Sequence, residues 1–229
     1  MARISNKGTG AQIVYFDSEG RQNLEEVLRV IKKALSKREE LRSLKIVFFT
    51  AEGQGPALAY SKLREYKPKM IAVTFPLHYS VKLDESEERY FPRIADDIRC
   101  FFDGVKIDVV VPPSLPLDSI DDLDGHNQQV KVIHQTIAMF GSGFGLCIQA
   151  VLRACDVGLL AEGELVIAIS GDTAGLFSAS TTSHFLKRFG GLRVQEIFCK
   201  ASNLTLSRPV VKRFAEPQEK KVLEGKVST

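Results

Sequence analysis

Several apolar runs in this sequence end in glycines or hydroxyl-bearing residues, which are the residue types that hold anionic ligands. Backbone N–H groups of a glycine turn at a helix start, together with nearby hydroxyls, can donate to a phosphate. In an open parallel sheet the carboxyl ends of the strands share one edge, so these turns should meet there. We therefore predict a pocket for a phosphorylated small molecule. Its candidate binding residues are Ser18, Asn23, Thr50, Gly53, Gly55, Thr74, His78, Ser170, Gly171 and Thr173.

Asp172 complicates this interpretation, because its carboxylate would repel a phosphate in the same turn. Asp is also a preferred N-cap of helices, so a purely structural role fits the turn equally well. Both interpretations of the stretch SGDTA (170–174) stay open.

The acid–base candidates are few. His78 follows a strand end, Asp17 follows the first run, and Asp156 ends a predicted helix. No nucleophile paired with an oriented base is visible, so the sequence identifies no reaction. The chain has no GxxxxGK[ST] loop and no GxSxG turn after a strand.

Two further motifs resemble ligand sites but are better explained by structure. The stretch GSGFG (141–145) follows a predicted helix, whereas a dinucleotide fingerprint follows a strand, so we interpret it as a helix–helix joint. His126 lies near Asp121, Asp122 and Asp124, but a solvated acidic loop explains this cluster more simply than a metal site does. No metal site is therefore predicted.

Six apolar runs predict the strands that would position the pocket. The first three and the fifth are nearly continuous in apolar residues, as in strands covered on both faces of a parallel sheet. The last run alternates between apolar and polar residues, which predicts a half-exposed edge strand antiparallel to the others. The runs lie at 11–16, 45–50, 70–75, 106–111, 164–170 and 192–200.

Amphipathic segments between the runs predict helices, at 23–41, 55–64, 86–102, 127–140, 144–156 and 173–188. Asn23 followed by Glu26 predicts a capping box at the first of them. Because strands and helices alternate, we predict an α/β fold: a three-layer α/β/α sandwich around a mostly parallel sheet with an antiparallel edge strand.

Composition limits the classes of partner. The 229 residues carry a net charge of only +3 and no Trp, which does not indicate a nucleic-acid-binding protein. Residues 132–152 lack charged side chains, but three glycines and several polar residues favour two buried helices over a membrane span. The four Cys form no CxxC pair and lie in apolar segments, which predicts reduced core thiols of a cytoplasmic protein.

The predicted organisation is one α/β domain (11–202) between an N-terminal tail (1–10) and a charged C-terminal tail (203–229). The tail suits contacts in a homo-oligomer. A Pro- and Asp-rich stretch at 112–127 predicts a long loop, which in a compact domain tends to have a function.

The order of the motifs resembles a small family that is similar to the C-terminal domain of pyruvate kinase standing alone. The resemblance covers about residues 11–202 and rests on IVYFDSEGRQNLEEVL, KIVFFT, IAVTF, LCIQAVLRACDVGLL and VIAISGDTAGLF. Phe16, Gly20 and Asn23 match the family's first strand and turn, and Asp172-Thr173-Ala174 matches the residues after its fifth strand. Cys155-Asp156-Val157-Gly158 matches a helix end, with Cys replacing the family's Ala.

The resemblance implies a mixed sheet whose last strand is antiparallel, and a site able to hold a phosphorylated ligand such as FMN. It implies no pyruvate kinase activity, because the catalytic barrel has no counterpart here. The turn before Asp172 is shorter than the family's Gly-rich version, and the loop at 52–55 has fewer Ser and Thr, so ligand contacts do not transfer directly.

Three functions follow as hypotheses. The first is a small-molecule-binding domain that holds a phosphorylated metabolite or nucleotide, with FMN as one candidate. The second is a flavin-dependent oxidoreductase or a transferase that uses the same pocket. The third is an oligomeric interaction protein that uses its loop and tail.

Overall fold

The structure is a computed structural model that describes residues 12–82, 89–117 and 128–203. The predicted tails, apart from Asn203, and most of the predicted loop at 112–127 lie outside these residues. His126 and the three Asp residues near it lie outside them as well.

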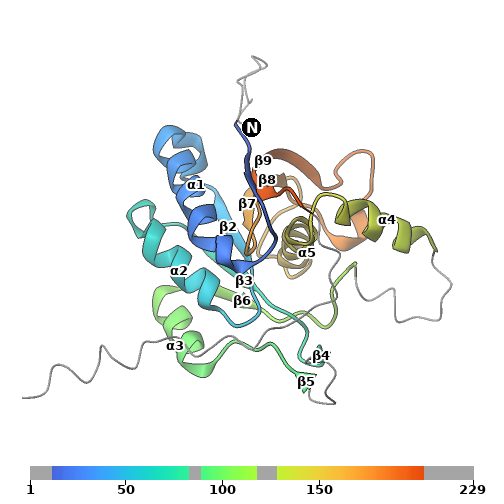
Figure 1. The fold of residues 1–229 in the computed structure, drawn as a ribbon, viewed down its shortest axis with the longest axis horizontal. Helices are drawn as coiled ribbons and strands as arrows, with labels where there is room; N and C mark the ends of the chain where they lie inside the picture. Colours follow the sequence, from blue (N-terminus) through green and yellow to red (C-terminus); the bar gives the residue numbers. More distant parts are fainter. Residues whose placement is uncertain (1–11, 83–88, 118–127, 204–229) are drawn as a thin grey trace, which may run out of the picture.

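A seven-stranded sheet forms the centre of the molecule (Figure 1). All of its strands run in one direction except β8, which is antiparallel to both neighbours. The order across the sheet is β1 (Val14–Phe16), β9 (Arg193–Ala201), β8 (Ala174–Ser178), β7 (Leu165–Ile169), β2 (Lys45–Phe49), β3 (Met70–Val73) and β6 (Asp108–Val110). A separate two-stranded sheet pairs β4 (Val81–Lys82) with β5 (Arg89–Tyr90).

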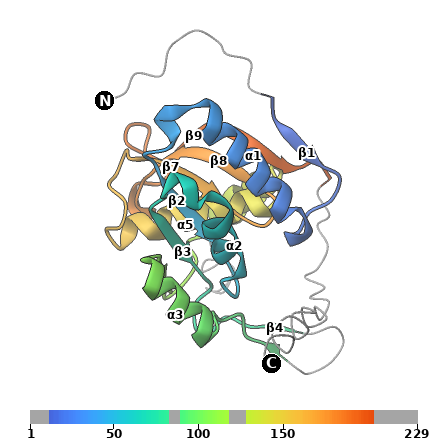
Figure 2. The same ribbon diagram turned by 90° about the vertical axis from the view of Figure 1, so that its left-hand side faces the viewer.

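Helices cover both faces of the sheet (Figures 1 and 2). One face carries α1 (Leu24–Lys37), α2 (Gln54–Leu63) and α3 (Asp96–Val105), and the other carries α4 (Gln128–Ala138) and α5 (Ser142–Asp156). Successive strand residues feed the two cores in turn, as β2 illustrates: Ile46 and Phe48 face α1 and α2, whereas Val47 and Phe49 face α5. The predicted α/β class with three layers is confirmed.

The prediction of an antiparallel edge strand at 192–200 is wrong in detail. β9 lies inside the sheet, between β1 and β8, and is parallel to most of it. Its half-exposed pattern arises because the three-residue β1 pairs only with Cys199–Ala201, which leaves the first half of β9 uncovered on that side.

The antiparallel strand is β8, where the sequence predicted a helix over 173–188. The chain turns back within Ser170–Thr173, and Ser170 N–H donates to the Thr173 carbonyl at 2.8 Å. Gly171-Asp172 in the middle of a four-residue turn is typical of a hairpin, and AGLFS then fills the buried position between β7 and β9. Within the predicted helix only the short 3-10 turn η4 (Thr182–His184) forms.

Two other local predictions are corrected. Helix α3 begins at Asp96 instead of residue 86, because β5 and Pro92 occupy the chain before it. The capping box is absent: the Asn23 side chain donates to the Ser18 carbonyl at 2.7 Å, and Glu26 pairs with Arg29.

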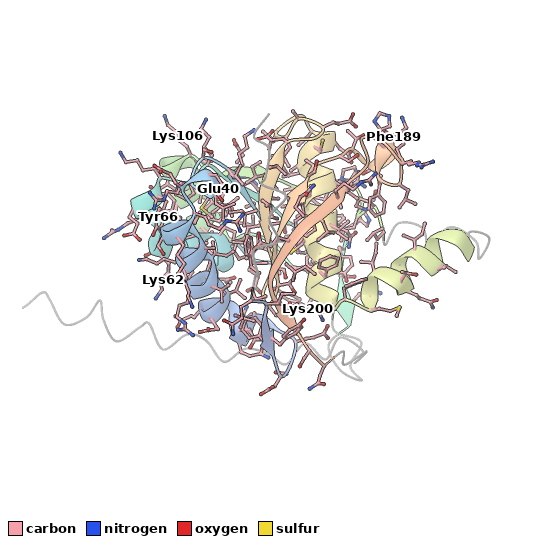
Figure 3. All side chains as sticks on the ribbon, turned by 90° about the horizontal axis from the view of Figure 1, so that it is seen from above. Glu40, Lys62, Tyr66, Lys106, Phe189 and Lys200 are labelled. Atoms are coloured by element: carbon pink, nitrogen blue, oxygen red, sulfur yellow. The ribbon has the colours of Figure 1, made fainter. Side chains whose placement is uncertain are left out.

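The glycine stretch at 141–145 joins α4 to α5, as predicted, and the two helices meet at 119°. Only α5 is buried as expected. The described side chains of α4 are half-buried or exposed, among them Val132, which is 58% exposed, and the helix reaches outward from the body (Figure 3). In the described part of the chain no single helix is long and apolar enough to cross a membrane, and α4 from Val132 meets that test only together with α5 as a bent pair.

The four cysteines are free, as predicted, and three of them are buried. Cys100 is the exception to the predicted core position, since it is exposed on α3.

Phe177 tests the assignment of β8. Its ring is fully buried against Phe144, so Phe177→Ala should lower the free energy of unfolding by about 3–5 kcal/mol. Phe189→Ala is the control: that side chain is 82% exposed at the surface (Figure 3), and its loss should change stability by less than about 0.5 kcal/mol. Urea unfolding followed by circular dichroism measures both. An equal change in the free energy of unfolding in both variants would contradict the burial of β8.

Candidate functional site

A cleft of about 530 Å³ opens at the carboxyl ends of β2 and β7. Its walls come from the β1–α1 loop, the start of α2, the first turn of α5 and the β7–β8 turn. The lining residues are Glu19, Gly20, Arg21, Leu24, Phe48, Phe49, Thr50, Ala51, Glu52, Gln54, Gly55, Phe75, Ser142, Gly143, Leu146, Ser170, Gly171 and Asp172.

The N-terminus of α5 points into this cleft. Gly141, the residue before the helix, has φ 109° and supplies no side-chain cap. The first-turn N–H groups of a helix lack internal partners and carry the positive end of the helix dipole. Ser142 N–H donates to Glu19 Oε1 at 2.8 Å, so a carboxylate of the chain itself sits at this helix end.

Gly143 lets the β7–β8 turn approach the helix closely. A Cβ atom at this position would lie 1.9 Å from Asp172 Oδ1 and 2.6 Å from both Ser170 Oγ and Thr173 Oγ1. No side chain fits in that space. The glycine therefore brings the polar groups of the turn against the first turn of α5.

The Asp172 carboxylate connects two sides of the cleft. Its Oδ2 accepts from Gly20 N–H at 2.7 Å, and its Oδ1 accepts from the Thr173 hydroxyl at 2.8 Å. Burial raises the pKa of Asp172, and the nearby Glu19 charge adds to this, while the two hydrogen bonds act in the opposite direction. In the folded protein the ionised form of Asp172 is therefore less favourable, relative to its neutral form, than it is in water.

Ser170 is fully buried beneath the start of α5, and its Oγ has no hydrogen-bond partner among the described residues. Its polar neighbour is the Cys147 thiol, which itself lies 3.7 Å from the Thr173 carbonyl. A thiol is a weak partner, and buried hydroxyls are normally satisfied. The hydroxyl is therefore only weakly satisfied, and Ser170 is one of the residues that line the cleft.

The rest of the cleft divides into an apolar wall and a charged rim. Leu24, Leu146 and Phe75 form the apolar part, and the Phe75 ring packs edge-on against Phe49 with centroids 4.9 Å apart. On the rim, Glu52 lies 3.6 Å from the Arg21 guanidinium and accepts from the Tyr90 hydroxyl and from Gln54. No group of His, Cys, Asp or Glu side chains within the described ranges is arranged to hold a metal ion.

Four predicted binding residues line the cleft: Thr50, Gly55, Ser170 and Gly171. Thr173 lies directly beneath it, bonded to Asp172.

Other predicted residues support the loops around the cleft. Gly53, in the left-handed region at φ 92°, donates to Thr50 Oγ1 at 2.9 Å, and the Thr74 hydroxyl donates to the Ala51 carbonyl at 3.3 Å. Ser18 and Asn23 hold the β1–α1 loop, where the Ser18 hydroxyl accepts from the side chain of Gln22.

The three acid–base candidates lie elsewhere. His78 and Asp17 are exposed and do not line the cleft. Asp156 ends α5 at the opposite end of the helix, where it accepts from Thr182 N–H and pairs with Arg153 at 3.0 Å. None of the three is among the residues that line the cleft.

Sequence reasoning missed the residues at the start of α5 and the charged residues of the cleft, Glu19, Arg21 and Glu52. GSGFG did signal close approach, but it follows a helix, and nothing local shows that this helix start faces the β7–β8 turn. A search of protein-family models finds none that matches this chain.

Gly143→Ala tests the contact between α5 and the turn. We expect it to lower the free energy of unfolding by at least about 2 kcal/mol, because backbone and buried polar groups must separate to admit the methyl group. Gly145→Ala is the matched control: its Cβ would meet Ile137 at an ordinary 3.5 Å, and alanine should gain about 0.5–1 kcal/mol in the helix. Thermal unfolding of both variants checks this. A Gly143→Ala protein as stable as the wild type would refute the close approach.

Asp172→Asn tests the buried carboxylate. Because its folded-state pKa is raised, Asp172 stabilises the fold below its ordinary pKa, and this contribution is lost as the pH rises through the raised value. The stability of the wild type relative to Asp172→Asn should therefore increase as the pH falls from 7 toward 4. Denaturant unfolding of both proteins across this range measures the difference in their free energies of unfolding. The other carboxyl groups are present in both proteins, so their contributions cancel in this difference. A pH-independent difference would contradict the raised pKa.

Proposed function

We propose that the protein binds a small phosphorylated molecule in this cleft, with the phosphoryl group at the start of α5. One observation carries the proposal: beside a helix N-terminus that opens into the cleft, the buried Ser170 hydroxyl has no hydrogen-bond partner stronger than the Cys147 thiol among the described residues. The helix dipole there favours an anion. The Ser142 N–H, which now donates to Glu19, and the Ser170 hydroxyl are the donors that it would meet.

The remainder of the cleft suits the body of such a ligand. A volume of about 530 Å³ lies within the range of small-molecule sites, and the wall of Leu24, Phe75 and Leu146 suits an apolar or aromatic group. FMN combines a phosphate with an aromatic ring system, and it is also the ligand that the resemblance to the pyruvate kinase C-terminal-domain-like family implies. We therefore propose FMN as the first ligand to test.

Binding rather than catalysis is the proposed role, because none of the three predicted acid–base residues lines the cleft. A cytoplasmic location belongs to the same proposal, in keeping with the free thiols of Cys147, Cys155 and Cys199.

FMN added to the purified protein should raise its melting temperature, with a stabilisation of about 2.7 kcal/mol when free FMN is a hundredfold above the dissociation constant. Quenching of flavin fluorescence gives the constant itself. Inorganic phosphate should compete with FMN for the same helix end. If neither FMN nor phosphate changes the melting temperature, the proposal fails.

Ser170→Ala should weaken FMN binding about fivefold to tenfold, since it removes a hydroxyl donor to a charged group. It should leave the free protein as stable as the wild type or more so, because among the described residues the hydroxyl that it removes has no partner stronger than the Cys147 thiol. Ser180→Ala is the control: this serine is equally buried but outside the cleft, so FMN affinity should stay unchanged. A loss of stability without a loss of affinity in Ser170→Ala would point to a structural hydroxyl.

A further inference from the structure

The anion position at the start of α5 is already occupied by the protein itself. Glu19 Oε1 accepts from Ser142 N–H at 2.8 Å, which is the geometry of a carboxylate ligand bound at a helix N-terminus. The partner is not a neighbour in sequence: Glu19 belongs to the loop between β1 and α1, 123 residues before Ser142.

The loop that carries Glu19 is held against the cleft by contacts other than its own carboxylate. Gly20 N–H donates to Asp172 Oδ2 at 2.7 Å, and the side chain of Gln22 donates to the Glu19 carbonyl at 2.6 Å. Gly171 packs on the backbone of Arg21, so that a Cβ there would lie 3.1 Å from Arg21 Cα. Glu19 can therefore leave the helix end while the base of the loop stays anchored.

The charges of the cleft make this carboxylate a competitor for an anionic ligand. Glu19, Glu52 and Asp172 are the acidic residues among those that line it, and Arg21 is the basic one, already 3.6 Å from Glu52. A phosphate that approached the helix end with Glu19 in place would meet a like charge at the same donor. A second anion binds well there only after the first has left.

We propose that Glu19 is a built-in competitor, whose carboxylate holds the start of α5 in the empty protein and is displaced when a phosphate monoester binds. The inference rests on the proposed function and adds a gate to it: the Glu19 carboxylate must leave Ser142 N–H before a phosphate binds there. Because the ligand binds only when Glu19 has moved away, the apparent affinity is the intrinsic affinity multiplied by the fraction of molecules in which the site is open. It also favours phosphate monoesters over monocarboxylates, since a monocarboxylate only replaces one carboxylate by another.

Glu19→Gln and Glu19→Ala test this gate. Glutamine keeps an oxygen that can accept from Ser142 N–H but removes the charge, and alanine removes both. FMN and inorganic phosphate should each bind about fivefold to tenfold more tightly to Glu19→Gln than to the wild type, and at least as tightly to Glu19→Ala. Glu25→Gln makes the same charge change on α1, outside the cleft, and should leave both affinities within about twofold.

A second readout follows the Ser142 amide by NMR. In the wild type, phosphate should shift the Ser142 amide resonance as Glu19 leaves, and Glu19→Ala should shift it without any ligand. If the wild type binds FMN or phosphate but the Glu19 variants bind no more tightly, the gate is overturned and the proposed function stands. Weaker binding by both variants would show that Glu19 supports the ligand, which also overturns the gate. Absence of FMN and phosphate binding by every variant would overturn both proposals.

Discussion

The contact of the Asp172 carboxylate with Gly20 N–H is the interaction on which the site depends. It fastens the β1–α1 loop to the β7–β8 turn, 152 residues apart in the chain, and Gly143 brings α5 onto the same carboxylate. The loop and the turn are short and polar, so neither would keep its position through apolar burial alone. The buried carboxylate, whose pKa is raised by desolvation, therefore organises the edge of the sheet at a cost to stability.

The cleft follows from the connectivity of the sheet. Helices α4 and α5 lie between the parallel strands β6 and β7 in the chain, and α5 leads into β7, so the first turn of α5 lies at the carboxyl ends of the strands, where its dipole faces the cleft. Glycines at 141 and 143 leave two positions at that end without side chains. A helix start with larger residues would be closed by its own side chains and would have no room for the turn.

The groups that lower the stability of the fold gather at this edge of the sheet. Among the described residues, the buried Ser170 hydroxyl has no partner stronger than a thiol, Asp172 is a buried carboxylate, and Glu19 and Glu52 add like charges nearby. The centre of the sheet, by contrast, is apolar on both faces. Proteins commonly tolerate such local conflicts where a ligand resolves them, which agrees with binding at this cleft.

The sequence by itself determined the class of fold, because hydrophobic periodicity is local: the apolar runs that became β1, β2, β3, β6, β7 and β9 and the amphipathic faces of α1 and α5 follow from their own residues. It also placed Thr50, Gly55, Ser170 and Gly171 at strand ends that proved to share one cleft. Only the tertiary structure decided that AGLFS is the antiparallel strand β8, because its five residues suit a strand or a helix until β7 and β9 provide hydrogen bonds on both sides. The roles of Glu19 and Gly143 were likewise decided by the fold, since each depends on atoms more than twenty residues away in the chain, and no local pattern records such a contact.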